Sequence, residues 1–466
     1  MPARMQDVIV VVPGIMGSTL IDSDGDELWG VRPGTLLQSI VRLGRNFKKL
    51  TLPAGIQDAP APDGVQPGAF IPIPHVVGKL LGTDGYGRLV NWLGNRFDVR
   101  QPSARNPGNL LLFPYDWRLS NRVNAKRIET ELVPMLEAWR TASGNPDAKF
   151  RFICHSMGGL IARWFIEVLG GRALTRQLIT IGTPHRGAAE ALIRLSNGFD
   201  PGFGPVRFRM TDILRSLPSA HQLLPTYRCL DVPGGPKRVD EVLIPDVDTA
   251  MLTDALAFHR AIQEAVGNGA PDAYEKFALK GVDQPTATGA RFAGGRLEPQ
   301  RQIGEHEYRG DGTVPRVSSH YPEWHNDSYA AAFGQQHATL QSDANLHRQL
   351  FAILTAGEVE AYAGAESRFG LELPEVVTAG HPLLARVTSP AGDETLPLRA
   401  TAFGEDGREL EGRLMRNIGS GTYEATFADL PPGQVTVRIG SATPNRPLDP
   451  VTGMTLVWDP GLDSDL

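Results

Sequence analysis

Short apolar runs alternate with stretches of helical periodicity along the first two thirds of the chain. The runs DVIVVV (7–12), NLLLF (109–113), KFRFIC (149–154) and QLITI (177–181) have the β-branched and aromatic character of strands buried on both faces. The stretches 87–97, 121–142 and 158–169 carry apolar residues at helical spacing, and a further strand (276–281) and helix (344–355) follow. Strands that are separated by helices form parallel βαβ units. The pattern therefore predicts an α/β protein with a mostly parallel central sheet.

Two stretches interrupt this alternation. Residues 30–82 are irregular and rich in Gly and Pro, and a loop of this length within a compact domain usually has a function. We therefore expect a lid there. Residues 197–271 break up into short amphipathic pieces such as 211–224, which is typical of a cap inserted into the sheet domain.

After about residue 366 the pattern changes to short alternating runs. They lie at 384–387, 396–402, 422–427, 435–439 and 454–458, with turn sequences such as PAGD, EDGR and LPPGQ between them. Short strands at such spacing predict a small all-β sandwich of the immunoglobulin-like kind. Because 466 residues exceed the size of one ordinary core, we expect two domains, 1–365 and 366–466.

Composition and charge restrict the class of partner. The formal net charge is −6, and no long basic block is present, so nucleic acid is not an expected partner. No apolar run reaches the ~18–20 residues of a membrane span, and the first residues lack the pattern of a secretory signal. We therefore expect a cytoplasmic protein, with peripheral contact to a membrane surface left open. The two cysteines, Cys154 and Cys229, are too few for a disulfide framework.

The sharpest chemical signal is ICHSMGGLIARW at 153–164. A strand, a tight turn that carries Ser156 and a helix that begins with two glycines are typical of a nucleophile elbow. Such an elbow exposes the serine oxygen above the sheet and directs the next backbone N–H toward the developing oxyanion. Cys154 replaces the first glycine of the G-x-S-x-G pattern and is small enough for that position. An ordinary strand–turn–helix that happens to contain a serine is the alternative.

A serine nucleophile needs a base, and the base needs an orienting carboxylate. In hydrolases with this elbow the order along the chain is Ser, then Asp or Glu, then His. Asp311 lies in the Gly-flanked turn RGDGTVP, and His337 in FGQQHATLQ lies just before the last helix of the sheet domain. We therefore predict a triad of Ser156, Asp311 and His337. Weaker candidates for the acid are Asp343, Asp327 and Glu323, and the other histidines considered are His155, His185, His320, His325 and His347.

An oxyanion hole needs a second backbone N–H from the loop after an earlier strand. The turn in VVVPGIMGS contains Gly14 and Gly17, which allow it to curl, so the amide of Ile15 is predicted to pair with that of Met157. A turn that only ends a strand is the alternative. No metal-ligand spacing is recognised, and a reaction of this kind needs no cofactor, so neither is expected.

Six motifs together resemble the lecithin:cholesterol acyltransferase family, which includes lysosomal phospholipase A2 and many bacterial lipase-like members. They are VVVPGIMGS, LLFPYDWRLS, ICHSMGGLIARWF, TIGTPHRGA, LPSAHQLLP and GDGTVP, in the family's order over roughly residues 7–355. The resemblance implies an α/β-hydrolase fold, the same triad and oxyanion amides, and a structural role near the site for Asp116 and Trp117. Mammalian members have a lid pinned by a disulfide, whereas residues 30–82 contain no cysteine. The C-terminal sandwich lies outside the resemblance.

The expected function is that of a serine carboxylic-ester hydrolase acting on lipid esters through an acyl-enzyme, as a phospholipase or lipase. A lipid O-acyltransferase is the nearest alternative, because the triad does not decide whether water or an acceptor alcohol attacks the acyl-enzyme. A third interpretation is a cytoplasmic lipase effector regulated by a protein partner that binds the sandwich. A passive sandwich is its alternative, and a non-catalytic binding protein is the least favoured. The expected partner is a lipid or other acyl-ester substrate.

Overall fold

The fold is that of a computed structural model of the chain. It describes residues 2–30, 49–71, 85–200, 202–203, 206–207, 210–269, 273–324, 330–356, 369–389, 392–443 and 448–459. Much of the predicted lid, namely 31–48 and 72–84, lies outside the described residues, and so does the predicted domain boundary near residue 366.

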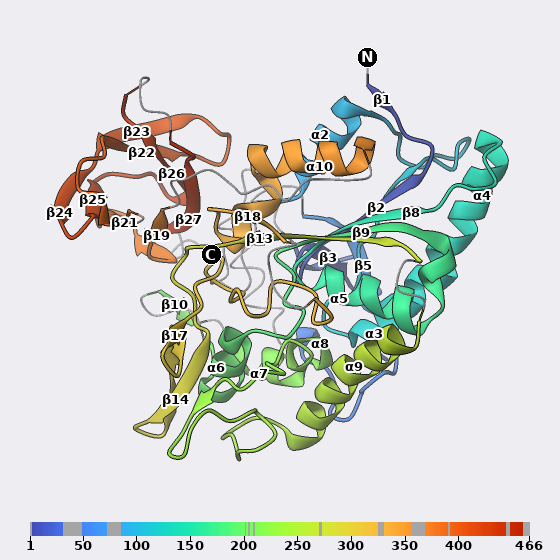
Figure 1. Ribbon diagram of the computed structural model, residues 1–466, viewed down its shortest axis with the longest axis horizontal. Helices are drawn as coiled ribbons and strands as arrows, with labels where there is room; N and C mark the ends of the chain where they lie inside the picture. Colours follow the sequence, from blue (N-terminus) through green and yellow to red (C-terminus); the bar gives the residue numbers. More distant parts are fainter. Residues whose placement is uncertain are drawn as a thin grey trace.

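A six-stranded sheet forms the centre of the molecule (Figure 1). Its strands lie in the order β18-β13-β9-β8-β2-β7, and every pair of neighbours is parallel. The strands are β18 (Ala331–Phe333), β13 (Glu275–Gly281), β9 (Thr175–Ile181), β8 (Phe150–His155), β2 (Val8–Val12) and β7 (Leu110–Leu112). The predicted parallel sheet is confirmed. All carboxyl ends consequently meet at one edge, where ligand sites form in open α/β sheets.

The helices at 87–97, 121–142, 158–169 and 344–355 that the sequence predicts are present. The described α-helices are α2 (Gly87–Arg96), α3 (Asn121–Arg127), α4 (Val133–Ser143), α5 (Gly158–Arg163), α6 (Ala189–Asn197), α7 (Met210–Ser216), α8 (Pro218–His221), α9 (Thr249–Asn268) and α10 (Ala344–Ala356). The π-helical turn η1 (Ile128–Leu132) joins α3 to α4, and a second one, η2 (Trp164–Val168), extends α5. The described 3-10 helices are η3 (Gly171–Leu174) and η4 (His337–Ser342).

Helices cover both faces of the sheet, which is why its strands are continuously apolar. Successive side chains of a strand point to opposite faces. In β2, Val8, Val10 and Val12 pack into the larger core, to which α3 and α5 contribute, whereas Ile9 and Val11 pack into a second core with α2 and α10.

The prediction of only short pieces in the cap was wrong for its last part. Residues 249–268 form the single helix α9, which is 20 residues long. The side chain of Asp248 caps it by accepting the N–H of Met251, and Phe258 stacks on Trp164 with ring centroids 5.1 Å apart. The apolar periodicity of this segment is weak, and packing against η2 together with the cap at Asp248 stabilises it as one long helix.

Short strands outside the central sheet and the C-terminal part form further small sheets. Their strands are β1 (Ala3–Arg4), β3 (Ser18–Ile21), β4 (Glu27–Trp29), β5 (Gln66–Phe70), β6 (Phe97–Asp98), β10 (Gly202–Phe203), β11 (Val206–Arg207), β12 (Leu230–Asp231), β14 (Gly289–Ala293), β15 (Arg296–Gln300), β16 (Gln302–Ile303) and β17 (His306–Glu307). Strand β5, which belongs to the stretch predicted as a lid, pairs with β3 directly after the first turn of the central sheet.

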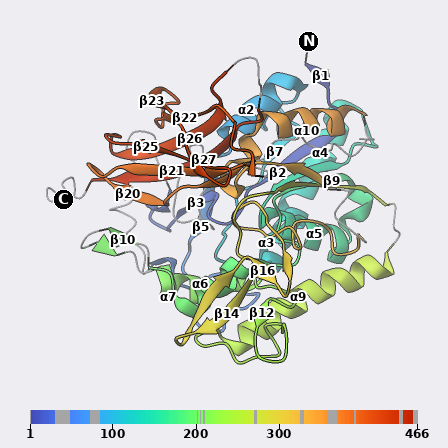
Figure 2. The ribbon, with the colours of Figure 1, turned by 60° about the vertical axis from the view of Figure 1, so that its left-hand side comes forward.

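The C-terminal part is all β, as predicted. One sheet has the order β19-β21-β25-β24 and the other β20-β27-β26-β22-β23, and both contribute to one apolar core. The strands are β19 (Gly370–Glu372), β20 (Val376–Thr378), β21 (Leu383–Thr388), β22 (Leu398–Phe403), β23 (Glu409–Leu414), β24 (Arg416–Gly419), β25 (Thr422–Phe427), β26 (Gly433–Ser441) and β27 (Val451–Trp458). This β-sandwich, residues 369–459, lies beside β13 and β18 of the central sheet (Figures 1 and 2).

Candidate active site

The three residues of the predicted triad lie together at the carboxyl edge of the central sheet. Ser156 follows β8, and His337 follows β18 as the first residue of η4. Asp311 lies in a turn that pairs with Gln284, three residues beyond β13. All three side chains are buried, with exposed fractions of 6%, 1% and 3% for Ser156, Asp311 and His337.

Ser156 occupies a strained turn. Its φ of +51° lies in the left-handed region, which costs energy for a residue other than glycine. The turn is fixed on both sides, because the Ser156 N–H donates to the carbonyl of Ile181 at 2.9 Å and the Thr183 hydroxyl donates to the carbonyl of Ser156 at 2.9 Å. A Cβ at Gly158 would lie 2.5 Å from the carbonyl oxygen of Pro13, so only glycine allows this approach of elbow and neighbouring loop.

The hydrogen bonds among the three side chains form one chain. His337 Nε2 lies 2.9 Å from Ser156 Oγ, and His337 Nδ1 lies 2.7 Å from Asp311 Oδ2. The other carboxylate oxygen of Asp311 accepts the N–H groups of Thr313 and Val314 at 3.0 and 2.6 Å. The carboxylate is therefore held by its own turn with one oxygen directed at the imidazole.

The turn after β2 lies against the elbow. A Cβ at Gly14 would lie 2.9 Å from that of Ser156 and 3.5 Å from its hydroxyl oxygen, so the backbone of this turn passes close to the serine. In the described part of the chain neither the amide of Ile15 nor that of Met157 donates a hydrogen bond to another group. Their role as an oxyanion hole stays a prediction.

The FPYDWR motif supports this turn, in agreement with the structural role expected for Asp116 and Trp117. The Tyr115 hydroxyl donates to the carbonyl of Pro13 at 3.0 Å, and Trp117 Nε1 donates to the carbonyl of Ser18 at 3.1 Å. The buried Arg118 forms ion pairs with Asp116 and Asp63, each at 2.7 Å. No side chain of the motif is bonded to the three residues above.

A second hydrogen-bonded link, which the sequence analysis missed, joins the turn to the histidine loop. The Tyr86 hydroxyl accepts the N–H of Gly14 at 2.7 Å and lies 2.8 Å from His155 Nδ1. His155 Nε2 lies 3.2 Å from the carbonyl oxygen of His337. A carbonyl only accepts, so Nε2 of His155 carries the proton and Nδ1 accepts from Tyr86. Burial and the nearby His337 hold the pKa of His155 well below 6.5, which keeps this neutral tautomer.

The weaker candidates for the acid have other roles. Glu323 is paired with Arg163 and Lys276 at 2.9 and 2.8 Å. Asp343 accepts the first amides of α10, from Asn345 and Leu346, and burial raises its pKa. Asp327 lies outside the described residues.

The other histidines lie in separate environments. His185 Nε2 is 3.1 Å from the Thr180 hydroxyl, His320 Nδ1 is 3.3 Å from the carbonyl of Arg316, and His347 stacks on Trp92. His325 lies outside the described residues. The two cysteines are buried free thiols, and burial raises the pKa of Cys154 well above its usual range.

Apolar residues of the predicted cap belong to the core. Leu214, Leu217, Leu223 and Leu224 are at most 2% exposed and join the larger core. Within the described ranges, no cluster of His, Cys, Asp and Glu is arranged to hold a metal ion, and no helix there has the length and apolarity to cross a membrane. The cytoplasmic location stays a prediction.

The sheet order and the strand–elbow–helix geometry define an α/β-hydrolase. Residues 103–289 match the family model of lecithin:cholesterol acyltransferase, so the predicted resemblance to that family is confirmed over this segment. The match supports an enzyme of the lipid-ester hydrolase or acyltransferase class.

Two solved structures of one protein are similar over most of the chain. The lipase BlEst2 of Bacillus licheniformis in its propeptide form is 11% identical, with 98% of this chain and 95% of that chain covered and a TM-score of 0.35. Its mature form is 13% identical, with coverages of 76% and 94% and a TM-score of 0.35. Comparison with curated proteins gives no match.

Proposed function

We propose that this protein is a serine carboxylic-ester hydrolase that acts on lipid esters, as a phospholipase or lipase. Ser156 is the nucleophile, His337 the general base and Asp311 its orienting carboxylate. The observation that carries the proposal is the unbroken chain of hydrogen bonds from Asp311 Oδ2 through His337 to Ser156 Oγ, with distances of 2.7 and 2.9 Å. Nucleophile, base and orienting acid within hydrogen-bond reach are what acyl transfer by serine requires.

The reaction begins when His337 Nε2 takes the proton of Ser156 as its oxygen attacks the ester carbonyl. The resulting oxyanion is held by the amides of Ile15 and Met157, donors of a type that each contribute ~2.7–4 kcal/mol to transition-state stabilisation. The left-handed φ of Ser156 is the strained backbone conformation that such an elbow requires. The imidazolium then protonates the leaving alcohol or lysolipid, and an acyl-enzyme remains.

A second step frees the enzyme. With His337 again as base, water attacks the acyl-enzyme and releases a fatty acid. If an alcohol attacks instead, the product is a new ester. The family match favours lipid acyl groups and keeps a lipid O-acyltransferase as the second candidate. A non-catalytic binding protein would have no need for a strained serine aligned with a histidine and a buried carboxylate.

Incubation with phosphatidylcholine vesicles, followed by mass spectrometry of the lipids, tests the proposal. The wild-type protein is expected to release lysophosphatidylcholine and fatty acid in equal amounts, and the Ser156→Ala variant neither. A new ester in place of free fatty acid, when a fatty alcohol is added, would assign acyl transfer. Equal product with wild type and Ser156→Ala, or none with either, would contradict a phospholipase that uses Ser156.

A further inference from the structure

The β-sandwich contacts the loop that carries His337. Its strand β27 approaches η4 closely: a Cβ at Gly453 would lie 2.6 Å from the side-chain oxygen of Gln336. At the far end of β27, Leu456 and Trp458 are buried in the larger core of the hydrolase part. The sandwich is therefore anchored at both ends of this strand.

Gln284 lies where the turn with Asp311, the loop with His337 and the β-sandwich meet, and it is fully buried. Its backbone exchanges two hydrogen bonds with Gly310, the residue before Asp311, at 2.9 and 3.3 Å. Its side-chain amide donates to the carbonyls of Gly334 and Phe369 at 3.1 and 2.7 Å, and its side-chain oxygen accepts the N–H of Leu371 at 2.9 Å. One side chain therefore joins the histidine loop to the sandwich, while its backbone holds the aspartate turn.

The residues directly before His337 repeat this arrangement. The side chain of Gln336 donates to the carbonyl of Leu371 at 2.8 Å. The side chain of Gln335 donates to the carbonyl of Pro450 at 2.6 Å and accepts the N–H of Thr452 at 3.0 Å. These partners are backbone groups of the sandwich, so their positions depend on how it docks and not on any one of its side chains.

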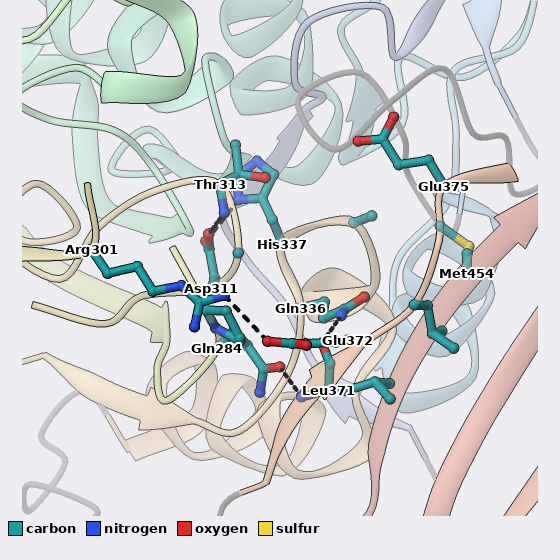
Figure 3. A pocket seen from close by; sticks show the side chains of 14 residues that line it. Gln284, Arg301, Asp311, Thr313, Gln336, His337, Leu371, Glu372, Glu375 and Met454 are labelled. Carbon is teal, nitrogen blue, oxygen red and sulfur yellow. Dashed lines mark hydrogen bonds and ion pairs between the residues drawn. The ribbon is translucent and has the colours of Figure 1, made fainter. Parts of the chain in front are cut away.

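Ionic contacts across the same junction are weaker. Arg301 and Glu372 are 3.2 Å apart, but their side chains are 62% and 39% exposed, so water screens the pair. A pocket of about 270 Å³ lies next to this pair and is lined by Asp311, His337 and Gln336 together with Glu372 and Met454 of the sandwich (Figure 3). The sandwich thus forms a wall beside the catalytic side chains.

We propose that Gln284 and Gln336 are positioning residues, through which the docked sandwich holds the histidine loop in the geometry that the reaction needs. This inference rests on the proposed function. Strand β18, which precedes the histidine loop, has only three residues and pairs with β13 alone at the edge of the sheet. The loop therefore receives much of its support from the sandwich, and a displacement of about 1 Å of a catalytic group can cost ~10²-fold in rate.

Full-length variants with matched volume test the inference on the short ester p-nitrophenyl butyrate. Gln284→Met and Gln336→Met remove the hydrogen bonds and keep an unbranched side chain of similar size. We expect kcat to fall about 100-fold and about 10-fold, respectively, while KM changes by less than about twofold, because the groups affected align the base and do not bind the ester.

Tyr423→Phe is the matched control within the sandwich. The Tyr423 hydroxyl accepts the N–H of Leu396 and donates to the carbonyl of Asp393, both at 2.9 Å, so this variant weakens the sandwich without touching the junction. We expect its kcat to stay within about twofold of wild type at temperatures below its melting transition.

The rate of amide hydrogen exchange distinguishes a sandwich that positions His337 from one that is only attached to the enzyme. Coupling between two sites is reciprocal, so a tetrahedral phosphonyl adduct on Ser156, formed with a p-nitrophenyl phosphonate, must tighten the docking that holds His337. The amides of Leu371 and Thr452 are expected to exchange several-fold more slowly in the adduct than in the free enzyme.

The outcomes separate the two proposals. Two results overturn the positioning role and leave the proposed function standing. One is ester hydrolysis that is lost in Ser156→Ala but unchanged in both glutamine variants. The other is hydrogen exchange at Leu371 and Thr452 that is the same in the adduct and in the free enzyme. A wild-type protein that neither hydrolyses the ester nor reacts with the phosphonate at Ser156 overturns the proposed function, and the positioning role with it.

Discussion

The elbow that carries Ser156 and the loop that carries His337 are built in different ways. The elbow is local: β8, the turn and α5 follow one another from residue 150 to residue 163. The histidine loop is assembled from distant segments. Its partners Asp311, Leu371 and Thr452 lie 26 to 117 positions from the residues they bind.

This difference separates two ways of placing a catalytic group. The strain of the elbow is stored in a φ of +51° and is held by the central sheet. The histidine loop has little regular structure of its own and depends on side chains that reach across the fold. We therefore expect changes to elbow packing to act mainly on stability, and changes around the histidine loop to act mainly on rate.

Removal of either end of the hydrogen-bond chain is expected to have the largest effect. Ser156→Ala removes the proposed nucleophile, and Asp311→Asn places an amide N–H opposite His337 Nδ1, which favours the wrong tautomer. Each is expected to lower kcat by ~10⁴-fold or more, by analogy with other triads. Steady-state kinetics with p-nitrophenyl butyrate measure this, and far-UV circular dichroism checks the fold.

A companion variant tests whether the elbow stores strain. In Ser156→Gly the left-handed φ costs nothing, so this inactive variant is expected to unfold at higher urea concentration than Ser156→Ala. A lower midpoint would contradict strain at this position.

Tyr86→Phe breaks the link between the turn after β2 and the histidine loop. It leaves the buried N–H of Gly14 and Nδ1 of His155 without the hydroxyl that binds both. We expect kcat to fall ~10–100-fold because the amide of Ile15, a proposed oxyanion donor, is misaligned. The free energy of unfolding is expected to fall by ~1–3 kcal/mol. A loss of stability with unchanged kcat would show that the link is structural only.

Gly158→Ala tests the packing of the elbow. The new methyl group would lie 2.5 Å from the carbonyl oxygen of Pro13, so the free energy of unfolding is expected to fall by ~1–3 kcal/mol. The control is Gly94→Ala in α2, where nothing but the adjoining backbone of the helix itself and the two neighbouring residues lies within 4 Å of the new methyl group. This change is expected to stabilise the protein by ~0.5–1 kcal/mol through helix propensity. Urea denaturation of both variants provides the measurement.

Mild acid is expected to leave the His155 link intact. Because burial holds the pKa of His155 well below 6.5, the folded protein keeps this ring neutral, whereas the unfolded chain takes up a proton below about 6.5. The free energy of unfolding therefore falls as the pH falls below that value. Nitrogen-15 NMR of the ring is expected to show the Nε2–H tautomer unchanged between pH 8 and pH 6. Protonation of the ring in the folded state within this range would contradict the assignment.

The sequence predicts the triad of Ser156, Asp311 and His337 from its motifs, and not the residues that hold its parts together. The elbow could be recognised because strand, turn and helix are contiguous, and the strands of the central sheet because both faces are apolar. Tyr86, Gln284 and Gln336 carry no such signal, since a tyrosine and two glutamines acquire their roles only when distant backbone groups meet them. Strand β18 escaped prediction because it has three residues.

The most direct test of the central claim, that Ser156 attacks the ester, is to trap the acyl-enzyme. Wild-type protein is mixed with p-nitrophenyl butyrate, quenched in acid and digested, and the peptides are analysed by mass spectrometry. The account predicts one butyryl group on the peptide that contains Ser156, located on Ser156 by fragmentation. Butyryl on another residue in active protein, or turnover that persists in Ser156→Ala, would contradict it.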